Sequence, residues 1–330
     1  MGQKAGPVVR LKARPSAGII EASLWGEVPS ETTPPVIPSR PRSGVEAPSS
    51  LAQQRLWRLS RVEPRTPIKN FCKGMRLTGR LDVRALEAGL GRIVERHESL
   101  RTTFEDRNGQ PVQVIRSETG PSLVVMDLAQ LAERERWSEV RRVAAREAQE
   151  AFDLTRGPLL RVTLIRLAED EHALILSAHP IVFDRGSFAV FSSELGTWYE
   201  AFCSGGTPQP LPSPPIQYSD VAASEAGTLV SEVLGAEVEF WKRQLAGSLP
   251  SLQLPVDRSR PAVSTLRGAE QRFEWGASLT EGLEELSRQE GVTLLVTLLS
   301  AFNALLCRYT GQDEIVVGAP ISGRDAPGSE

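Results

Sequence analysis

Cysteine and histidine, the residues that build disulfides and most metal centres, are scarce in this sequence. Its 330 residues include three histidines and three cysteines, Cys72, Cys203 and Cys307, which lie far apart. No CxxC or HExxH motif and no glycine-rich phosphate loop occurs, so the sequence argues against metal and nucleotide chemistry. An odd number of scattered cysteines predicts buried thiols rather than disulfides.

Long apolar runs and charge of one sign are also lacking. Apolar stretches such as residues 294–299 are too short to cross a bilayer, and residues 1–15 have no continuous apolar segment of the signal-peptide kind. The 38 basic and 41 acidic residues are well mixed, with a formal charge of −3 and no basic block for nucleic acid. Because 40% of the residues are hydrophobic and 24% are charged, we expect a cytoplasmic globular protein without a membrane or nucleic-acid partner.

Proline is abundant in two places, which indicate linkers. Residues 1–48 are rich in Pro, Gly and Ser and include PPVIPSRPRSG. Proline fixes φ and removes a hydrogen-bond donor, so this segment is predicted to be an extended linker or docking segment outside any core. GGTPQPLPSPP at 205–215 predicts a second linker. The expected domains are therefore 49–210 and 211–330.

Between the linkers, hydrophobic periodicity and capping residues predict alternating helices and strands. Helices are expected at 51–59, from Asp82 to about 96, and at 131–151, 187–202, 231–245, 279–291 and 294–309; strands are expected at 112–115, 122–126, within 267–275 and, as a buried strand, at 315–321. LLRVTLIRL (159–167) and HALILSA (172–178) predict a β-hairpin with AED at its turn. The pattern is that of a mixed α/β protein.

Five segments share their residues and their order with the conserved motifs of one protein family. They are SLAQQRLWRL (50–59), RHESLRTTF (96–104), HPIVFDRGS (179–187), YSD (218–220) and GAPISGR (318–324). In this order they resemble the five motifs of the condensation domains of nonribosomal peptide synthetases. The resemblance covers about residues 49–325, and five ordered motifs are far more specific than any single one.

The resemblance implies an α/β fold of two chloramphenicol-acetyltransferase-like sandwich subdomains that form a V. Two carrier-bound substrates enter a tunnel between them from opposite faces. Family members continue past the fifth motif, so the second subdomain is expected to be incomplete. The implied partners are upstream and downstream peptidyl or acyl carrier proteins, whose phosphopantetheine arms hold the substrates. Three explanations of the incomplete subdomain stay open: a fragment of a longer protein, a remnant of a decayed gene, or a piece that assembles with a polypeptide supplying the missing C-terminal elements. No cofactor is expected to bind the domain directly.

The third motif carries the family's active site and is altered here. The family pattern is HHxxxDG, and an ungapped alignment puts His179 at the first His, Pro180 at the catalytic His, Asp184 at the Asp and Arg185 at the Gly. Proline has no ionisable group, so the general base, which contributes a factor of about 10² to 10⁴, is lost. The alignment predicts an impaired site.

The residues after the altered position are expected to line the tunnel: Arg185, Gly186 and Ser187. Arg185 places a long cation where glycine leaves room for the pantetheine arm. For Ser187 a helix N-cap is favoured over a nucleophile, because no histidine stands where a Ser-His-Asp triad needs it.

The remaining candidates are the histidines and the charged residues of the motifs. His179 is either a surrogate base or, as the family's supportive first His, a buried hydrogen-bonded residue. Asp184 is expected to pair with Arg324 of the fifth motif, or with Arg101 of the second, since a buried carboxylate needs a partner and arginine offers a planar fork. His97 is favoured as a structural residue at a helix end, and His172 as a surface residue.

Two functions remain open from the sequence. One is a condensation-type acyltransferase that forms an amide or ester bond from a carrier thioester, with impaired activity. The other is a non-catalytic module that docks carrier proteins or recruits another enzyme. A related acyltransferase acting on a free alcohol or a CoA thioester shares the motif and meets the same difficulty at Pro180.

Overall fold

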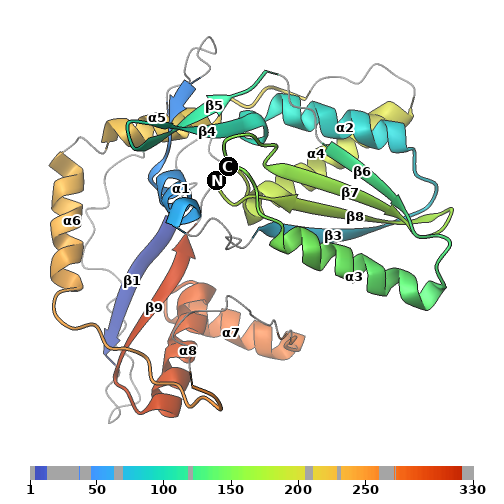
Figure 1. Cartoon of the computed structure of the whole chain (residues 1–330). Coiled ribbons are helices and arrows are strands. Elements are labelled where there is room, and N and C mark those ends of the chain that lie inside the picture. Colours follow the sequence, from blue (N-terminus) through green and yellow to red (C-terminus); the bar gives the residue numbers. More distant parts are fainter. Residues whose placement is uncertain are drawn as a thin grey trace. The chain divides into compact units, whose positions relative to one another are not determined.

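The computed structural model describes residues 4–12, 37, 46–62, 70–117, 122–204, 211–228, 232–259, 271 and 273–321. These residues divide into two compact units, one made mainly of 46–234 and the other of 5–12 and 235–320. The elements in chain order are β1 (Lys4–Lys12), β2 (Glu46–Pro48), α1 (Leu51–Val62), β3 (Phe71–Thr78), α2 (Val83–Arg96), the 3₁₀ helix η1 (Glu98–Arg101), β4 (Thr102–Arg107), β5 (Gln110–Ile115), β6 (Ser122–Asp127), α3 (Glu133–Gln149), β7 (Leu160–Arg166), β8 (Glu171–Ala178), α4 (Arg185–Cys203), α5 (Tyr218–Thr228), α6 (Glu232–Gln244), α7 (Ala277–Gln289), α8 (Leu294–Thr310) and β9 (Glu314–Ile321) (Figure 1). The domain boundary predicted at residue 210 stays a prediction.

A four-stranded sheet in the order β3-β8-β7-β6 is the centre of the first unit (Figure 1). The predicted hairpin is confirmed, with β7 and β8 antiparallel from Leu160↔Ala178 to Arg166↔His172. Alternate residues of a strand face opposite sides of its sheet. Accordingly Leu174 and Leu176 pack with α2 and α4, whereas the intervening Ile175 packs with α3. The sheet is thus covered by helices on both faces.

Two strands lie where the sequence predicted only a linker, and that prediction was wrong for them. β2 pairs with β5 in the three-stranded sheet β2-β5-β4, and Ala47 is 2% exposed. β2 is an edge strand, where Pro48 is tolerated because an edge does not need every N–H. β1 pairs with β9 in a two-stranded sheet; its Val8 and Val9 favour a strand, and its only proline is Pro7.

Several helix ends follow the capping residues of the sequence. Ser50 and Gln53 form a reciprocal capping box at the start of α1, because each side chain accepts the other residue's backbone N–H. Asp82 accepts from the N–H groups of Arg84 and Ala85 at the start of α2. Thr293 caps α8, which ends at the left-handed Gly311 with φ 69°.

The second unit contains α6, α7, α8 and β9. The predicted strand within 267–275 is absent from its described residues, 271 and 273–275. The predicted strand at 315–321 is present, but it is not the buried strand expected, since Ile315 is the buried residue among its described side chains. Within the described part of the chain no single helix could span a membrane; α7 and α8 reach the required length and hydropathy only as a pair bent by 104°.

Two smaller predictions about burial were also wrong. The prediction of buried thiols is wrong for Cys203, which is exposed at the end of α4. Cys307 and Cys72 are partly buried, and Cys72 packs against the hydrophobic cluster that includes Val140 and Val143 of α3. His172 is 5% exposed rather than a surface residue, since β8 is an inner strand of its sheet.

Candidate functional site

The loop that joins β8 to α4 carries the altered motif and forms a β-turn. The N–H of Val182 donates to the carbonyl of His179 at 3.1 Å, and the N–H of His179 donates to the carbonyl of Leu159 at 3.0 Å. Pro180 is therefore the second residue of the turn, the position that proline's fixed φ suits best. Its missing N–H costs no hydrogen bond there. Proline fits this loop without disturbing it.

His179 is buried and neutral. The residue is 4% exposed, and its Nδ1 accepts the N–H of Ile181 at 3.1 Å. That bond assigns the remaining proton to Nε2. The ring lies edge-on to Phe152, with 6.1 Å between ring centroids, and burial lowers the pKa of His179 to about 4. A general base works best with a pKa near the working pH, so this environment favours the buried hydrogen-bonded role over that of a surrogate base.

Asp184, not Ser187, is the N-cap of α4. Its Oδ1 accepts the backbone N–H and the hydroxyl of Ser187, both at 2.7 Å. The prediction that Ser187 caps the helix was wrong because the helix begins two residues earlier, at Arg185, and Asp caps as well as Ser does. The hydroxyl of Ser187 is thereby committed as a donor to a carboxylate.

Of the two arginines expected to pair with Asp184, only Arg101 lies among the described residues. Arg101 donates to the carbonyl of Arg116 at 2.8 Å and lies 3.9 Å from the carboxylate of Glu98. It is therefore not a partner of Asp184. Arg324 lies outside the described residues, and its pairing with Asp184 stays a prediction.

Two of the three positions expected to line the tunnel face solvent in the first turn of α4. Arg185 and Gly186 are exposed, and Ser187 and Pro180 are partly buried. An exposed Arg185 side chain is free to take several directions, and its cation stands at the positive end of the helix dipole, where a positive charge is disfavoured.

A cavity of about 290 Å³ lies in the same unit, beside the first two turns of α4. It is lined by Ile93, Arg96, His97, Ser99, Leu100, Val182, Phe183, Ser187, Val190, Phe191, Glu194, Pro214, Pro215, Ile216, Gln217, Tyr218 and Val221. Glu194 binds Arg96 Nε through Oε1 at 2.9 Å and His97 Nε2 through Oε2 at 2.8 Å. Although burial opposes its ionisation, these hydrogen bonds and charges lower the pKa of Glu194. His97 thus has the structural contact expected at a helix end.

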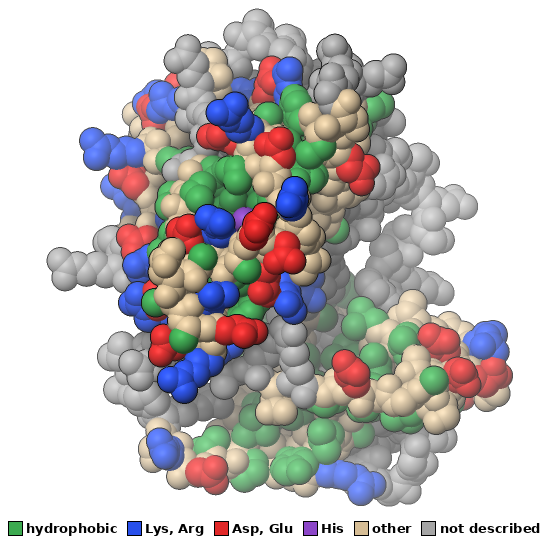
Figure 2. Space-filling view, turned by 90° about the vertical axis from the view of Figure 1, so that its right-hand side faces the viewer, with side chains coloured by type: hydrophobic (Ala, Val, Ile, Leu, Met, Phe, Trp, Pro, Cys, Tyr) green, Lys and Arg blue, Asp and Glu red, His purple; other side chains and the backbone are tan. Residues whose placement is uncertain are grey.

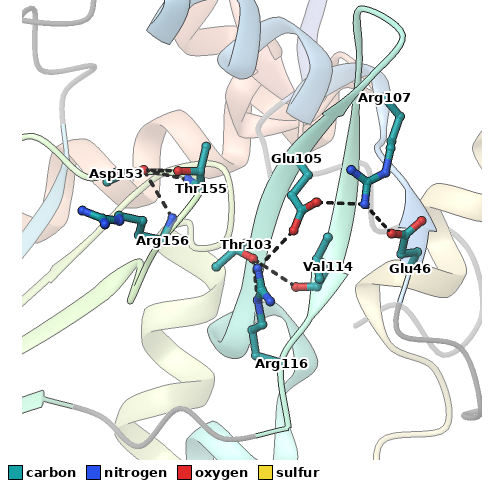
Figure 3. Close-up of polar contacts among 9 residues, drawn as sticks. All are labelled: Glu46, Thr103, Glu105, Arg107, Val114, Arg116, Asp153, Thr155 and Arg156. Carbon is teal, nitrogen blue, oxygen red and sulfur yellow. Dashed lines mark hydrogen bonds and ion pairs between the residues drawn. The ribbon is translucent and has the colours of Figure 1, made fainter.

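Charged residues elsewhere in the first unit form mixed networks. Glu46, Arg107, Glu105 and Arg116 make a chain of ion pairs with N···O distances of 2.7 to 3.2 Å across β2, β4 and the end of β5 (Figure 3). Most of these groups are exposed, so the chain contributes little to stability. On the face drawn in Figure 2, basic and acidic side chains of the described residues lie among one another. Within the described part of the chain no cluster of three or more His, Cys, Asp or Glu is placed to hold a metal ion.

Comparison with known proteins identifies the family. Residues 45–330 match the family model of the condensation domain. The chain belongs to the condensation-domain family. It is 45% identical over 316 residues to one of the linear gramicidin synthase proteins of Brevibacillus parabrevis, covering 95% of this chain and 4% of that protein. It is 38% identical over 293 residues to phosphinothricin tripeptide synthetase PhsC of Streptomyces viridochromogenes, covering 89% of this chain and 27% of that protein. The domain therefore spans a small part of these relatives.

Solved structures agree with the mixed α/β fold expected of a condensation domain. The X-domain from teicoplanin biosynthesis, in its complex with OxyB, has a TM-score of 0.72 at 27% identity, covering 89% of this chain and 69% of that one. The starter condensation domain of rhizomide synthetase RzmA has a TM-score of 0.54 at 22% identity, covering 63% and 52%, a likeness of fold alone. The predicted chloramphenicol-acetyltransferase-like α/β class is confirmed.

The structure also brings in residues that motif matching passed over. Gln53 lies in the first motif and Gln113 in β5, and both are buried near the loop of this condensation domain. Gln53 Nε2 donates to the carbonyl of Ile181 at 3.3 Å and to Gln113 Oε1 at 3.0 Å. The capping-box spacing of Ser50 and Gln53 was a local signal for the start of α1, but nothing local indicated the contact with Ile181.

Proposed function

We propose that this condensation domain acts in nonribosomal peptide biosynthesis, where it joins a carrier-bound acyl or peptidyl donor to an amine or hydroxyl acceptor with impaired activity. The acceptor nucleophile attacks the thioester carbonyl, the C–S bond breaks, an amide or ester forms, and the carrier thiol leaves. The observation that carries the proposal is the β8–loop–α4 segment, in which the motif's first His and its Asp are retained while Pro180 stands at the position of the base.

The proposed rate is low but not zero. Losing a general base removes a factor of about 10² to 10⁴. Holding two reactants in a productive geometry is worth up to about 7–11 kcal/mol, and this does not depend on an ionisable residue 180. An amine acceptor that enters already deprotonated needs the base least.

The proposed partners follow from the same family membership. They are upstream and downstream carrier proteins that present their substrates on phosphopantetheine arms. A cytoplasmic location belongs to the same proposal, because carrier loading and condensation share one compartment. The relatives named as peptide synthases and synthetases support this setting.

A second candidate function is that of a non-catalytic docking module. The observation that favours it is the likeness to the X-domain from teicoplanin biosynthesis, one of whose solved structures is a complex with OxyB. In this alternative the domain binds carrier proteins or recruits another enzyme without making bonds. Pro180 and the exposed cation of Arg185 support it equally well.

One assay separates the two candidates. The purified chain is mixed with a donor carrier and an acceptor carrier, each loaded with its aminoacyl group, and product is followed by mass spectrometry of the carrier-bound species. Condensed product above a no-protein control supports the acyltransferase. Binding of the loaded carriers without product favours the docking module. The absence of both binding and product contradicts the acyltransferase and a module that docks carrier proteins.

A further inference from the structure

Both backbone polar groups of Ile181, in the active-site loop, are hydrogen-bonded to buried side chains. Ile181 donates its N–H to His179 Nδ1 at 3.1 Å and accepts at its carbonyl from Gln53 Nε2 at 3.3 Å. Ile181 is 0% exposed, Gln53 1% and His179 4%. Because buried backbone groups keep the partners they have, these two bonds fix the residue that follows position 180.

The side-chain amide of Gln53 has hydrogen-bond partners at both its oxygen and its nitrogen. Gln53 Oε1 accepts the N–H of Ser50 at 3.0 Å, and its Nε2 also donates to Gln113 Oε1 at 3.0 Å. Gln113 in turn donates to the carbonyl of Pro48 at 2.7 Å. An amide whose donors and acceptor are all hydrogen-bonded has one orientation available. Gln53 therefore fixes the loop relative to the N-terminus of α1, although the two segments are 128 residues apart in the sequence.

The link extends to the fourth motif as well. Ser50 Oγ and the hydroxyl of Tyr218 lie 2.8 Å apart. The first, third and fourth motifs therefore meet in one hydrogen-bonded group built from Ser50, Gln53, Ile181 and Tyr218. Within this group Gln53 is the side chain that bonds the loop backbone, and Ser50 links it to Tyr218.

We infer that Gln53 is a positioning residue, which sets the direction of the side chain at position 180 by holding the Ile181 carbonyl. This inference rests on the proposed function, since it assigns Gln53 a part in the reaction. The hydrogen bonds of Gln53 to Ile181, Gln113 and Ser50 are present in this chain although Pro180 has no basic side chain. A base introduced at position 180 would therefore be held in a defined direction. The group acts through geometry alone and moves no proton.

The test replaces a side-chain amide by a carboxyl group at one of two neighbouring positions. Gln53→Glu keeps the acceptor for the N–H of Ser50, since Glu and Gln both complete a capping box, and deletes the amide that donates to Ile181 and to Gln113. Gln54→Glu is the matched control, because Gln54 is the next residue of α1 and donates to the carbonyl of Ser49 at 3.1 Å. Gln53→Met serves as a second variant without a buried carboxyl if Gln53→Glu does not fold.

The first readout is independent of catalysis. Amide hydrogen exchange of residues 179 and 181–184 in the otherwise unmodified chain is expected to rise by at least about tenfold in Gln53→Glu, because the loss of one hydrogen bond corresponds to about a factor of ten. It is expected to stay unchanged in Gln54→Glu. Equal exchange of this loop in the two variants overturns the inference. A uniform rise across the whole chain overturns it too, because it indicates a merely structural role.

The second readout is the split between kcat and KM in the Pro180→His, Arg185→Gly background. Adding Gln53→Glu is expected to lower kcat by about 10- to 100-fold with KM and the pH profile unchanged, the effect of a misdirected catalytic group. Faster exchange of the loop with an unchanged kcat overturns the positioning role. If the background variant itself makes no product, it is the proposed acyltransferase that fails, and the exchange readout alone decides whether Gln53 holds the loop.

Discussion

The imidazole of His179 accepts the backbone N–H of Ile181 through Nδ1 at 3.1 Å, and so spans Pro180. A histidine used in this way is a fixed acceptor rather than a proton carrier. The turn formed by residues 179–182 is held by this bond and by the bond between Val182 and His179. The shape of the loop therefore does not depend on which side chain follows His179.

The hydrogen-bond acceptor of His179 is expected to contribute more to the free energy of unfolding than the aromatic ring does. Leu and Asn have similar size, so His179→Leu and His179→Asn lose similar packing against Phe152. Asn retains an acceptor for the N–H two residues on, whereas Leu leaves that buried N–H unpaired at a cost of about 1–3 kcal/mol. Urea unfolding should show His179→Leu to be the less stable variant by about that amount. Equal stability of the two would show that the hydrogen bond is not what holds the loop.

Burial of His179 also predicts a pH dependence of stability. Its pKa is about 4 in the folded state and 6.5 as its ordinary value. Above pH 6.5 both states are neutral, and between 6.5 and 4 only the unfolded state binds the proton, so the free energy of unfolding falls as the pH is lowered. The loss is on the order of 3 kcal/mol in total and constant below pH 4.

His179→Asn is the control for that pH dependence because it cannot ionise at this position. The difference in unfolding free energy between the unmodified chain and His179→Asn, measured by urea denaturation at several pH values, isolates the histidine from the carboxylates that titrate in the same range. A difference that stays constant from pH 7 to 4 contradicts the assignment of a neutral, buried ring.

Local features were predictable from the sequence and long-range ones were not. The β7–β8 hairpin, the cap at Asp82 and the cap at Thr293 follow from alternation and from side chains that bond within three residues. The short strand β2 was missed because a pairing with β5 overrides a proline-rich composition. Burial of His172 likewise depends on which strands flank β8, and that information is not local.

In the candidate site, too, local features were predictable from the sequence and long-range contacts were not. Motif spacing correctly located the loop before α4, and Asp184 lies at the first turn of that helix, where it accepts from Ser187. Choosing between Asp184 and Ser187 as the cap required the helix start, which periodicity leaves open by one or two residues. The tie between Gln53 and Ile181 spans 128 residues, and no pattern within either segment indicates it.

The predicted pair of Asp184 and Arg324 can be tested by a double-mutant cycle. Asp184→Asn retains an acceptor for the N–H of Ser187, since Asn and Asp cap equally well, but loses the charge. If the two side chains pair, Asp184→Asn and Arg324→Gln are expected to be non-additive in urea unfolding, with a coupling of about 0.5–3 kcal/mol. Arg101→Gln combined with Asp184→Asn is the control and should be additive, because Arg101 contacts Glu98 and Arg116 instead. Additive effects of the first pair would remove Arg324 as the partner.

Restoring the base is the most direct test of what Pro180 does. The second position of a β-turn accepts most residues, so Pro180→His and Pro180→Ala should both fold, with unfolding free energies close to that of the unmodified chain. Both remove the proline, but only histidine adds a group that titrates near pH 7. In the assay with loaded donor and acceptor carriers, Pro180→His is expected to raise turnover over Pro180→Ala by about 10² to 10⁴, with a rate that increases through the pKa of the new imidazole.

Arg185→Gly, made alone and in combination, separates access of the pantetheine arm from base catalysis, since it should change KM rather than the pH profile. Equal turnover of Pro180→His and Pro180→Ala would mean that position 180 is not where the proton is taken, and would favour a docking module over an impaired enzyme.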